Sequence, residues 1–180
     1  EVVRHLLIGS HYRSPINYSD QSLRQSTAAL ERLYTALRGL DTKNAKLLAN
    51  SRFEKAFYVA MDDDFNTPEA FGVLFEIAKE INREKADNFE YASQLGALLL
   101  KLGNWLGMLE TSSEQFLRGN ASANKSADID PVAIDGLIEE RNQAREDKNW
   151  QKADEIRDQL AAMKVILEDG ADGSSWRIER

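Results

Sequence analysis

Residues 66–83 read NTPEAFGVLFEIAKEINR, and their pattern indicates a helical protein. Thr67 can cap a helix, and Pro68 at the first helical position is a strong start signal, because the first turn needs no hydrogen bond from that nitrogen. Apolar residues then recur at helical spacing, and those expected to face inward are Phe71, Leu74, Phe75, Ala78 and Ile81. The stretch predicts an amphipathic helix from Thr67 to about Arg83, with one face buried.

Stretches on either side repeat this pattern. Ser19 as an N-cap predicts a helix that runs to about Arg38, after an apolar segment (VVRHLLIG) and a loop (SHYRSPINYS). Two further helices are expected around residues 45–61 and 88–109, and the second carries an apolar stripe that places Trp105 in the core. Four amphipathic helices of this length predict a mainly α protein built on an antiparallel four-helix bundle.

Helical periodicity is lost in residues 110–129, ETSSEQFLRGNASANKSADI. Small polar residues of this kind are typical of a linker, so we expect the bundle to span 19–117, after a first segment at 1–18, with a linker at 118–130. In the remaining residues, 131–180, Pro131 opens one helix and Asn149 caps a second. VILED and SSWRI around GADG predict a β-hairpin, so this small domain combines a helical hairpin with a β-hairpin.

Composition excludes several classes of site. The chain has no cysteine and only two histidines, which removes disulfides, thiolate zinc sites and a cysteine nucleophile, and we expect no metal site here. No stretch approaches the roughly 20 apolar residues of a membrane helix, so we expect a cytoplasmic protein without a membrane partner. The net charge of −7 disfavours binding of nucleic acid through its phosphates. An RNA partner would have to be bound through local contacts to its bases.

Two polar stretches admit two interpretations each. The acidic stretch MDDDFNTP can supply Mg²⁺ ligands, but its carboxylates also suit the positive start of the following helix, which is the interpretation we favour. His11 and Arg13 in SHYRSP can contact a phosphate, or can fix the loop through hydrogen bonds.

Residues 144–160, AREDKNWQKADEIRDQL, pose the main functional question. Trp150 falls in the first turn of a helix, Asp154 follows on the same face, Arg145 precedes the connection, and Asp169 closes the first strand. Recognition of single-stranded RNA needs an aromatic ring that stacks on a base, with arginine and aspartate to bond its edge. The residues alone favour a simpler interpretation, an amphipathic hairpin with surface ion pairs.

Three stretches, residues 1–40, 60–83 and 137–180, resemble the C-terminal part of the bacterial cysteinyl-tRNA synthetase family, in the family's order and spacing. The resemblance implies a class I enzyme that activates cysteine with ATP and transfers it to the 3′ end of its tRNA. ATP and zinc would belong to a Rossmann-type catalytic domain. Neither its nucleotide-binding signatures nor its zinc-ligand cysteines occur in this sequence, so the chain alone is expected to be non-catalytic and without a cofactor.

The resemblance also assigns roles along the chain. It makes 1–18 the tail of a stem-contact region, 19–117 an anticodon-binding bundle and 131–180 a small anticodon-recognition domain. The family's anticodon readers fall on Arg145, Trp150, Asp154 and Asp169, which makes base reading the favoured interpretation of these residues. With a tRNA as partner, the phosphate that His11 and Arg13 can contact would belong to the tRNA backbone.

The expected partners are the anticodon stem-loop of cysteine tRNA and the protein's own catalytic domain, in a monomer. Lys164 stands where the family often has a glycine with positive φ. The alternative function is a helical protein-interaction domain without an RNA role, which the acidic charge favours.

Overall fold

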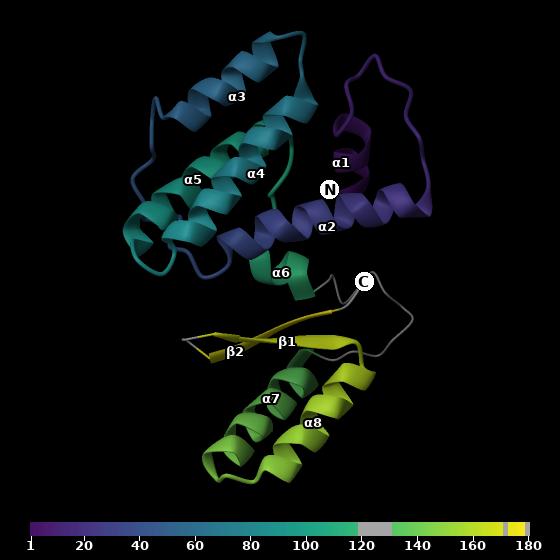
Figure 1. The fold of residues 1–180 in the computed structure, drawn as a ribbon, viewed down its shortest axis with the longest axis vertical. Helices are drawn as coiled ribbons and strands as arrows, with labels where there is room; N and C mark the ends of the chain where they lie inside the picture. Colours follow the sequence, from purple (N-terminus) through teal and green to yellow (C-terminus); the bar gives the residue numbers. More distant parts are fainter. Residues whose placement is uncertain (119–130, 171–172, 179–180) are drawn as a thin grey trace. The chain divides into compact units, whose positions relative to one another are not determined.

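The chain forms two compact units, Glu1–Ser113 and Glu114–Arg180. The computed structural model describes residues 1–118, 131–170 and 173–178 (Figure 1). The predicted mainly α class is confirmed. The predicted linker lies almost entirely outside the described residues, and the functional domain boundaries stay a prediction.

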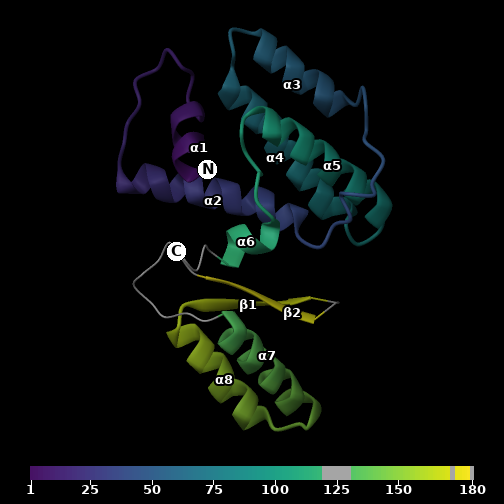
Figure 2. The ribbon, with the colours of Figure 1, turned by 180° about the vertical axis from the view of Figure 1, so that it is seen from behind.

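The first unit is built from five helices among its described residues: α1 (Val2–Ile8), α2 (Asp20–Leu37), α3 (Arg52–Asp62), α4 (Thr67–Glu84) and α5 (Phe89–Trp105). The helices α3, α4 and α5 lie side by side and alternate in direction (Figures 1 and 2). The helix α2 crosses α4 and also packs against α1. Short connections between α3, α4 and α5 enforce the antiparallel arrangement.

Each of the helices α2, α3 and α4 begins directly after a residue whose side chain caps it. The starts of α3 and α4 differ from the predictions. Ser19 caps α2 as predicted, since its Oγ accepts from the Ser22 N–H at 3.1 Å. In α4 the cap is Asn66 rather than Thr67, and Thr67 is the first helical residue. The helix α3 begins at Arg52 and not near residue 45, because Ser51 caps it and the Glu54 carboxylate reaches back to the Asn50 N–H at 2.6 Å.

The core of the first unit follows the predicted stripes except at Trp105. Its largest fully buried side chains are Leu30, Leu33, Tyr34, Phe57, Leu74, Ile77, Ile81, Leu95, Leu98, Leu99 and Leu102. Trp105 is 67% exposed, so its predicted place in the core was wrong. It is the last residue of α5, which ends before the predicted residue 109 as the chain turns at Gly107 (φ 66°). Its ring meets Tyr58 edge-on, with 6.1 Å between centroids. Periodicity predicted the direction of its side chain around the helix axis, but the described residues leave most of it uncovered at this end of the helix.

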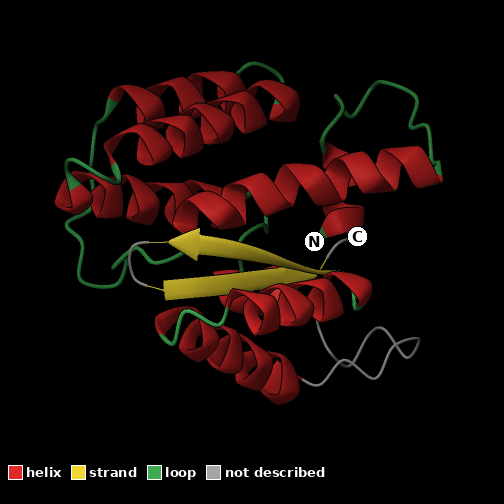
Figure 3. Ribbon diagram, turned by 60° about the horizontal axis from the view of Figure 1, so that its bottom comes forward, coloured by secondary structure: helices red, strands yellow, loops and turns green. Residues whose placement is uncertain are grey.

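The second unit is a helical hairpin with a two-stranded sheet. It contains α7 (Pro131–Glu146), α8 (Trp150–Ala162), β1 (Val165–Gly170) and β2 (Gly173–Ile178), preceded by α6 (Ser113–Arg118). The short helix α6 was not predicted, because six residues give too little periodicity to detect. The strands pair antiparallel with Leu167 opposite Trp176, so the predicted β-hairpin is confirmed (Figure 3).

A small core holds this unit together. Its buried members are Ile134, Ile138, Ile156, Leu160, Val165 and Trp176. The Trp176 Nε1–H donates to Asp135 Oδ1 at 2.7 Å, and the Arg118 guanidinium lies 5.0 Å from the Trp176 ring centroid. Lys164, between α8 and β1, has φ 59°, a conformation that favours glycine over a residue with a side chain.

Candidate nucleic-acid interface

A tight connection places Trp150 at the start of α8. The Asn149 side chain accepts from the Lys152 N–H at 3.2 Å, which confirms the predicted cap. The Asn149 N–H donates to Ala144 O at 2.8 Å and the Lys148 N–H to Arg145 O at 3.1 Å, so the backbone of Arg145 helps to close the turn. Lys148 has φ 57°, which lets the chain reverse between the two helices.

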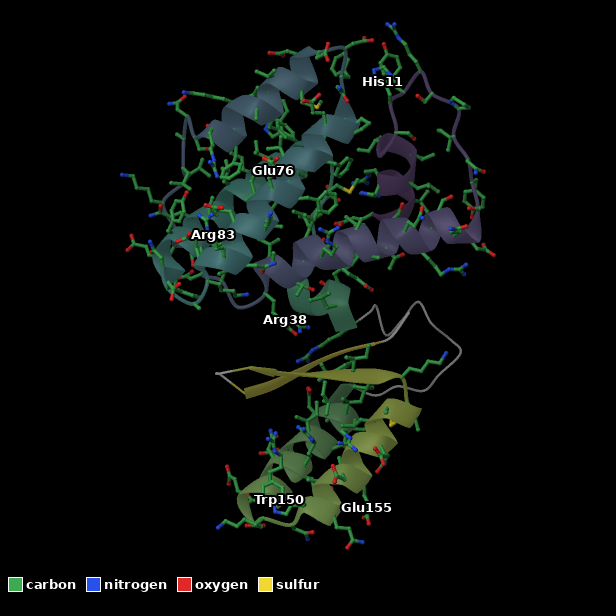
Figure 4. All side chains as sticks on the ribbon, in the orientation of Figure 1. His11, Arg38, Glu76, Arg83, Trp150 and Glu155 are labelled. Carbon is green, nitrogen blue, oxygen red and sulfur yellow. The ribbon has the colours of Figure 1, made fainter. Side chains whose placement is uncertain are left out.

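The side chain of Trp150 is 60% exposed. It lies at the connection end of the helical hairpin (Figure 4). The buried residues of α8 are Ala153, Ile156 and Leu160, on another face of the helix. The same unit buries Trp176 almost completely, at 1% exposure. Trp150 is therefore not part of the core, and its ring is open to a stacking partner.

Asp154 lies one turn after Trp150, with 63% of its side chain exposed. Its Oδ1 pairs with Arg157 Nη1 at 3.1 Å, and this is its only ion pair within the described part of the chain. Arg145 is exposed in the last turn of α7. These three predicted site residues thus lie around the connection end of the hairpin, and Arg157 joins them although the sequence interpretation did not single it out.

Asp169 is the fifth residue of β1, in register with Ser174. The strand begins after the end of α8 that is opposite the connection, and it runs across the helical hairpin (Figure 3). Its side chain lies outside the described residues, so its predicted role stays a prediction.

The flank of α8 that faces α7 is occupied by internal contacts. Lys152 Nζ lies 2.7 Å from Glu140 Oε1 on α7, and this hydrogen bond raises the pKa of Lys152. Because each helical residue turns the direction by about 100°, Trp150 points to the opposite flank from Lys152. The surface with Trp150 and Asp154 is thus directed away from α7.

In the first unit, His11 and Arg13 lie next to Asp64. The two polar stretches SHYRSP and MDDDFNTP therefore contact each other in the fold. Arg13 Nη2 lies 3.1 Å from Asp64 Oδ2, and His11 Nε2 lies 3.9 Å from the same oxygen. The Tyr12 hydroxyl donates to Asp64 Oδ1 at 2.8 Å, and this bond raises the pKa of Tyr12. The loop is thus fixed by hydrogen bonds, while Arg13 keeps 69% of its side chain exposed.

Among the residues that the structure describes, no group of three or more His, Cys, Asp or Glu side chains is arranged to hold a metal ion. None of the described helices is long and apolar enough to cross a membrane.

Parts of both units match known domain families. Residues 56–110 match the DALR domain, and residues 131–177 match the cysteinyl-tRNA ligase anticodon binding domain. The cysteine–tRNA ligase of Yersinia pestis bv. Antiqua (strain Angola) is 52% identical over 178 residues, which is 98% of this chain and 38% of that protein. The enzyme of Proteus mirabilis (strain HI4320) is 49% identical over 177 residues, with the same shares.

The chain therefore spans 38% of the length of these curated relatives. Two domain families occur in one chain, in the order DALR domain and then anticodon-binding domain. Identity of about one half extends over nearly the whole chain. The resemblance stated from the sequence is confirmed: the chain carries a DALR domain and an anticodon-binding domain of the cysteinyl-tRNA ligase family.

Proposed function

We propose that this chain is the tRNA-binding, anticodon-recognising portion of a cysteine–tRNA ligase, with Arg145, Trp150, Asp154 and Asp169 as its readers. The observation that carries the proposal is the exposed Trp150 at the head of α8, with Asp154 one turn away. Both residues lie within the match to the anticodon binding domain. A tryptophan ring that is not needed for the core is available for a base.

The anticodon of cysteine tRNA is GCA, which follows from the genetic code. Trp150 stacks on one splayed base, a contact worth roughly 1–3 kcal/mol. Arg145 donates to guanine O6 and N7, and the aspartates accept from amino groups or from guanine N–H groups. Such contacts are local, which suits a chain whose net charge is −7.

The chemistry of ligation belongs to the longer protein. ATP activation and the zinc that selects cysteine are functions of the catalytic domain, which this chain contacts as a partner within a cytoplasmic monomer. The chain itself is non-catalytic. His11 and Arg13 contact the tRNA backbone, and the support for this is that 69% of the Arg13 side chain is exposed beside Asp64.

Binding to labelled anticodon stem-loops tests this function. We expect the chain to bind a GCA stem-loop and to lose roughly ten- to hundred-fold in affinity when any one anticodon base is changed, because a good base contact is worth about 1–3 kcal/mol. A chimeric ligase, in which this chain replaces the matching part of the Yersinia pestis enzyme, should charge cysteine tRNA. Equal binding to all stem-loops together with an inactive, folded chimera would favour the alternative, a protein-interaction domain.

A further inference from the structure

A third side chain lies on the exposed flank of α8. With 3.6 residues per turn, Asp154 and Arg157 point within about 40° of Trp150, and the three follow one another along roughly 10 Å of the helix axis. All three are exposed. The flank thus presents an aromatic ring, a carboxylate and a guanidinium in succession.

Arg157 holds two carboxylates. Its Nη1 lies 3.1 Å from Asp154 Oδ1, and its Nη2 lies 3.3 Å from Asp158 Oδ1. The exposed fractions of the Arg157 and Asp154 side chains are 57% and 63%, so the pair contributes little to stability. The ion pair has two other consequences. Arg157 fixes the position of one Asp154 oxygen, and its positive charge partly neutralises an acidic flank that would otherwise repel RNA.

The pair also offers a matched set of hydrogen-bonding groups. A carboxylate accepts, and a guanidinium donates through five N–H groups, of which the two ion pairs occupy only part. Cytosine and adenine each present an amino donor next to a ring-nitrogen acceptor on the Watson–Crick edge. Uracil and guanine present a carbonyl acceptor next to a ring N–H, which is the reverse order.

We propose that Arg157 is a positioning and specificity residue, which orients Asp154 so that the pair accepts amino bases and rejects keto bases stacked on Trp150. This inference rests on the proposed anticodon function. Asp154 Oδ2 accepts from the amino group, and a remaining Arg157 N–H donates to the neighbouring ring nitrogen. The cytosine and the adenine of the GCA anticodon are the two bases with this edge.

The test compares the stem-loops GCA, GUA and GCG, bound to the wild-type chain and to Arg157→Ala, Arg157→Lys and Asp158→Asn. In the wild type we expect roughly a ten- to hundred-fold preference for GCA over at least one keto-base variant. Arg157→Ala should reduce that preference to within about threefold, and Arg157→Lys should restore it only in part, because lysine lacks the planar fork of donors. Asp158→Asn is the matched control, and it should keep the preference because the Arg157–Asp154 pair remains.

The outcomes separate the two proposals. A wild-type chain that binds GCA, GUA and GCG equally would overturn the proposed anticodon reading itself. A wild type that discriminates, with an Arg157→Ala variant that discriminates equally well, would overturn the role of Arg157 alone. Thermal unfolding of Arg157→Ala should match the wild type, and Arg157→Gln, which retains the aliphatic stem, replaces it if the alanine variant does not fold.

Discussion

Each unit of the chain leaves one tryptophan exposed, and the surroundings of the two rings differ. In the first unit, Trp105 is 67% exposed and rests edge-on against Tyr58. In the second unit, Trp150 is 60% exposed and shares its flank with Asp154 and Arg157, which pair at 3.1 Å. Exposure alone therefore does not identify a binding site. In the proposed function, the polar groups beside Trp150 distinguish its surface from the exposed helix end at Trp105.

The largest expected effect is a loss of stability in one unit when its core is disrupted. Trp176→Ala removes the central ring of the small core, together with its hydrogen bond to Asp135, and should cost about 3–5 kcal/mol. A unit of this size has little stability to lose, so we expect the second unit to unfold while the first stays folded. Hydrogen exchange of peptides from each unit measures this.

Leu98→Ala, in the core of the first unit, is the matched control and should expose the first unit instead. If Trp176→Ala abolished protection equally in both units, the units would not be independent in stability, and the comparison between them would lose its basis.

A pH effect caused by a buried tyrosine should appear in the first unit. Tyr34 is fully buried, and its hydroxyl donates to Glu1 Oε2 at 2.8 Å. Burial raises the pKa of Tyr34 to about 12, from 10.0. Because the folded state holds the proton more tightly, this stability is fully present below pH 10 and is lost as the pH rises toward 12, by about 2–3 kcal/mol in total.

Urea unfolding of the first unit between pH 10 and pH 12 tests that effect. Tyr34→Phe should show a shallower loss of stability than the wild type, whereas Tyr18→Phe, which alters an exposed ring, should follow the wild type. Parallel slopes for Tyr34→Phe and the wild type would show that the buried hydroxyl is not the cause.

A smaller effect of opposite sign is expected in the second unit alone. Lys164 holds φ 59° between α8 and β1, where a side chain costs something like 1 kcal/mol. Lys164→Gly should raise the free energy of unfolding of this unit by about 0.5–1 kcal/mol. Ala161→Gly, an exposed helical position nearby, should lower it by a similar amount. Destabilisation by both changes would contradict the strain at Lys164.

Sequence reasoning succeeded where a feature depends on local chemistry. The Ser19 and Asn149 caps and the β-hairpin all follow from a few neighbouring residues. It failed at Trp105, because periodicity gives the direction of a side chain but not the reach of the neighbouring helices.

Contacts between residues distant in the sequence also escaped prediction. Asp64 meets Arg13 across 51 residues, a contact that only the fold creates. The proposed role of Arg157 beside Asp154 could not be predicted for another reason. A surface arginine near an aspartate is common in helices and indicates no function until Trp150 is seen to be exposed.

In the proposed function, Trp150 is a platform for an anticodon base, whereas Trp105, with 67% exposure against 60% for Trp150, is not. The most direct test of this claim is the affinity of Trp150→Ala and Trp105→Ala for the GCA stem-loop at one salt concentration, with folding of both units verified by hydrogen exchange. Loss of stacking should weaken binding to Trp150→Ala by roughly ten- to hundred-fold, while Trp105→Ala should bind like the wild type. Equal affinities of the two folded variants for the stem-loop would contradict the claim and leave Trp150 an ordinary surface residue.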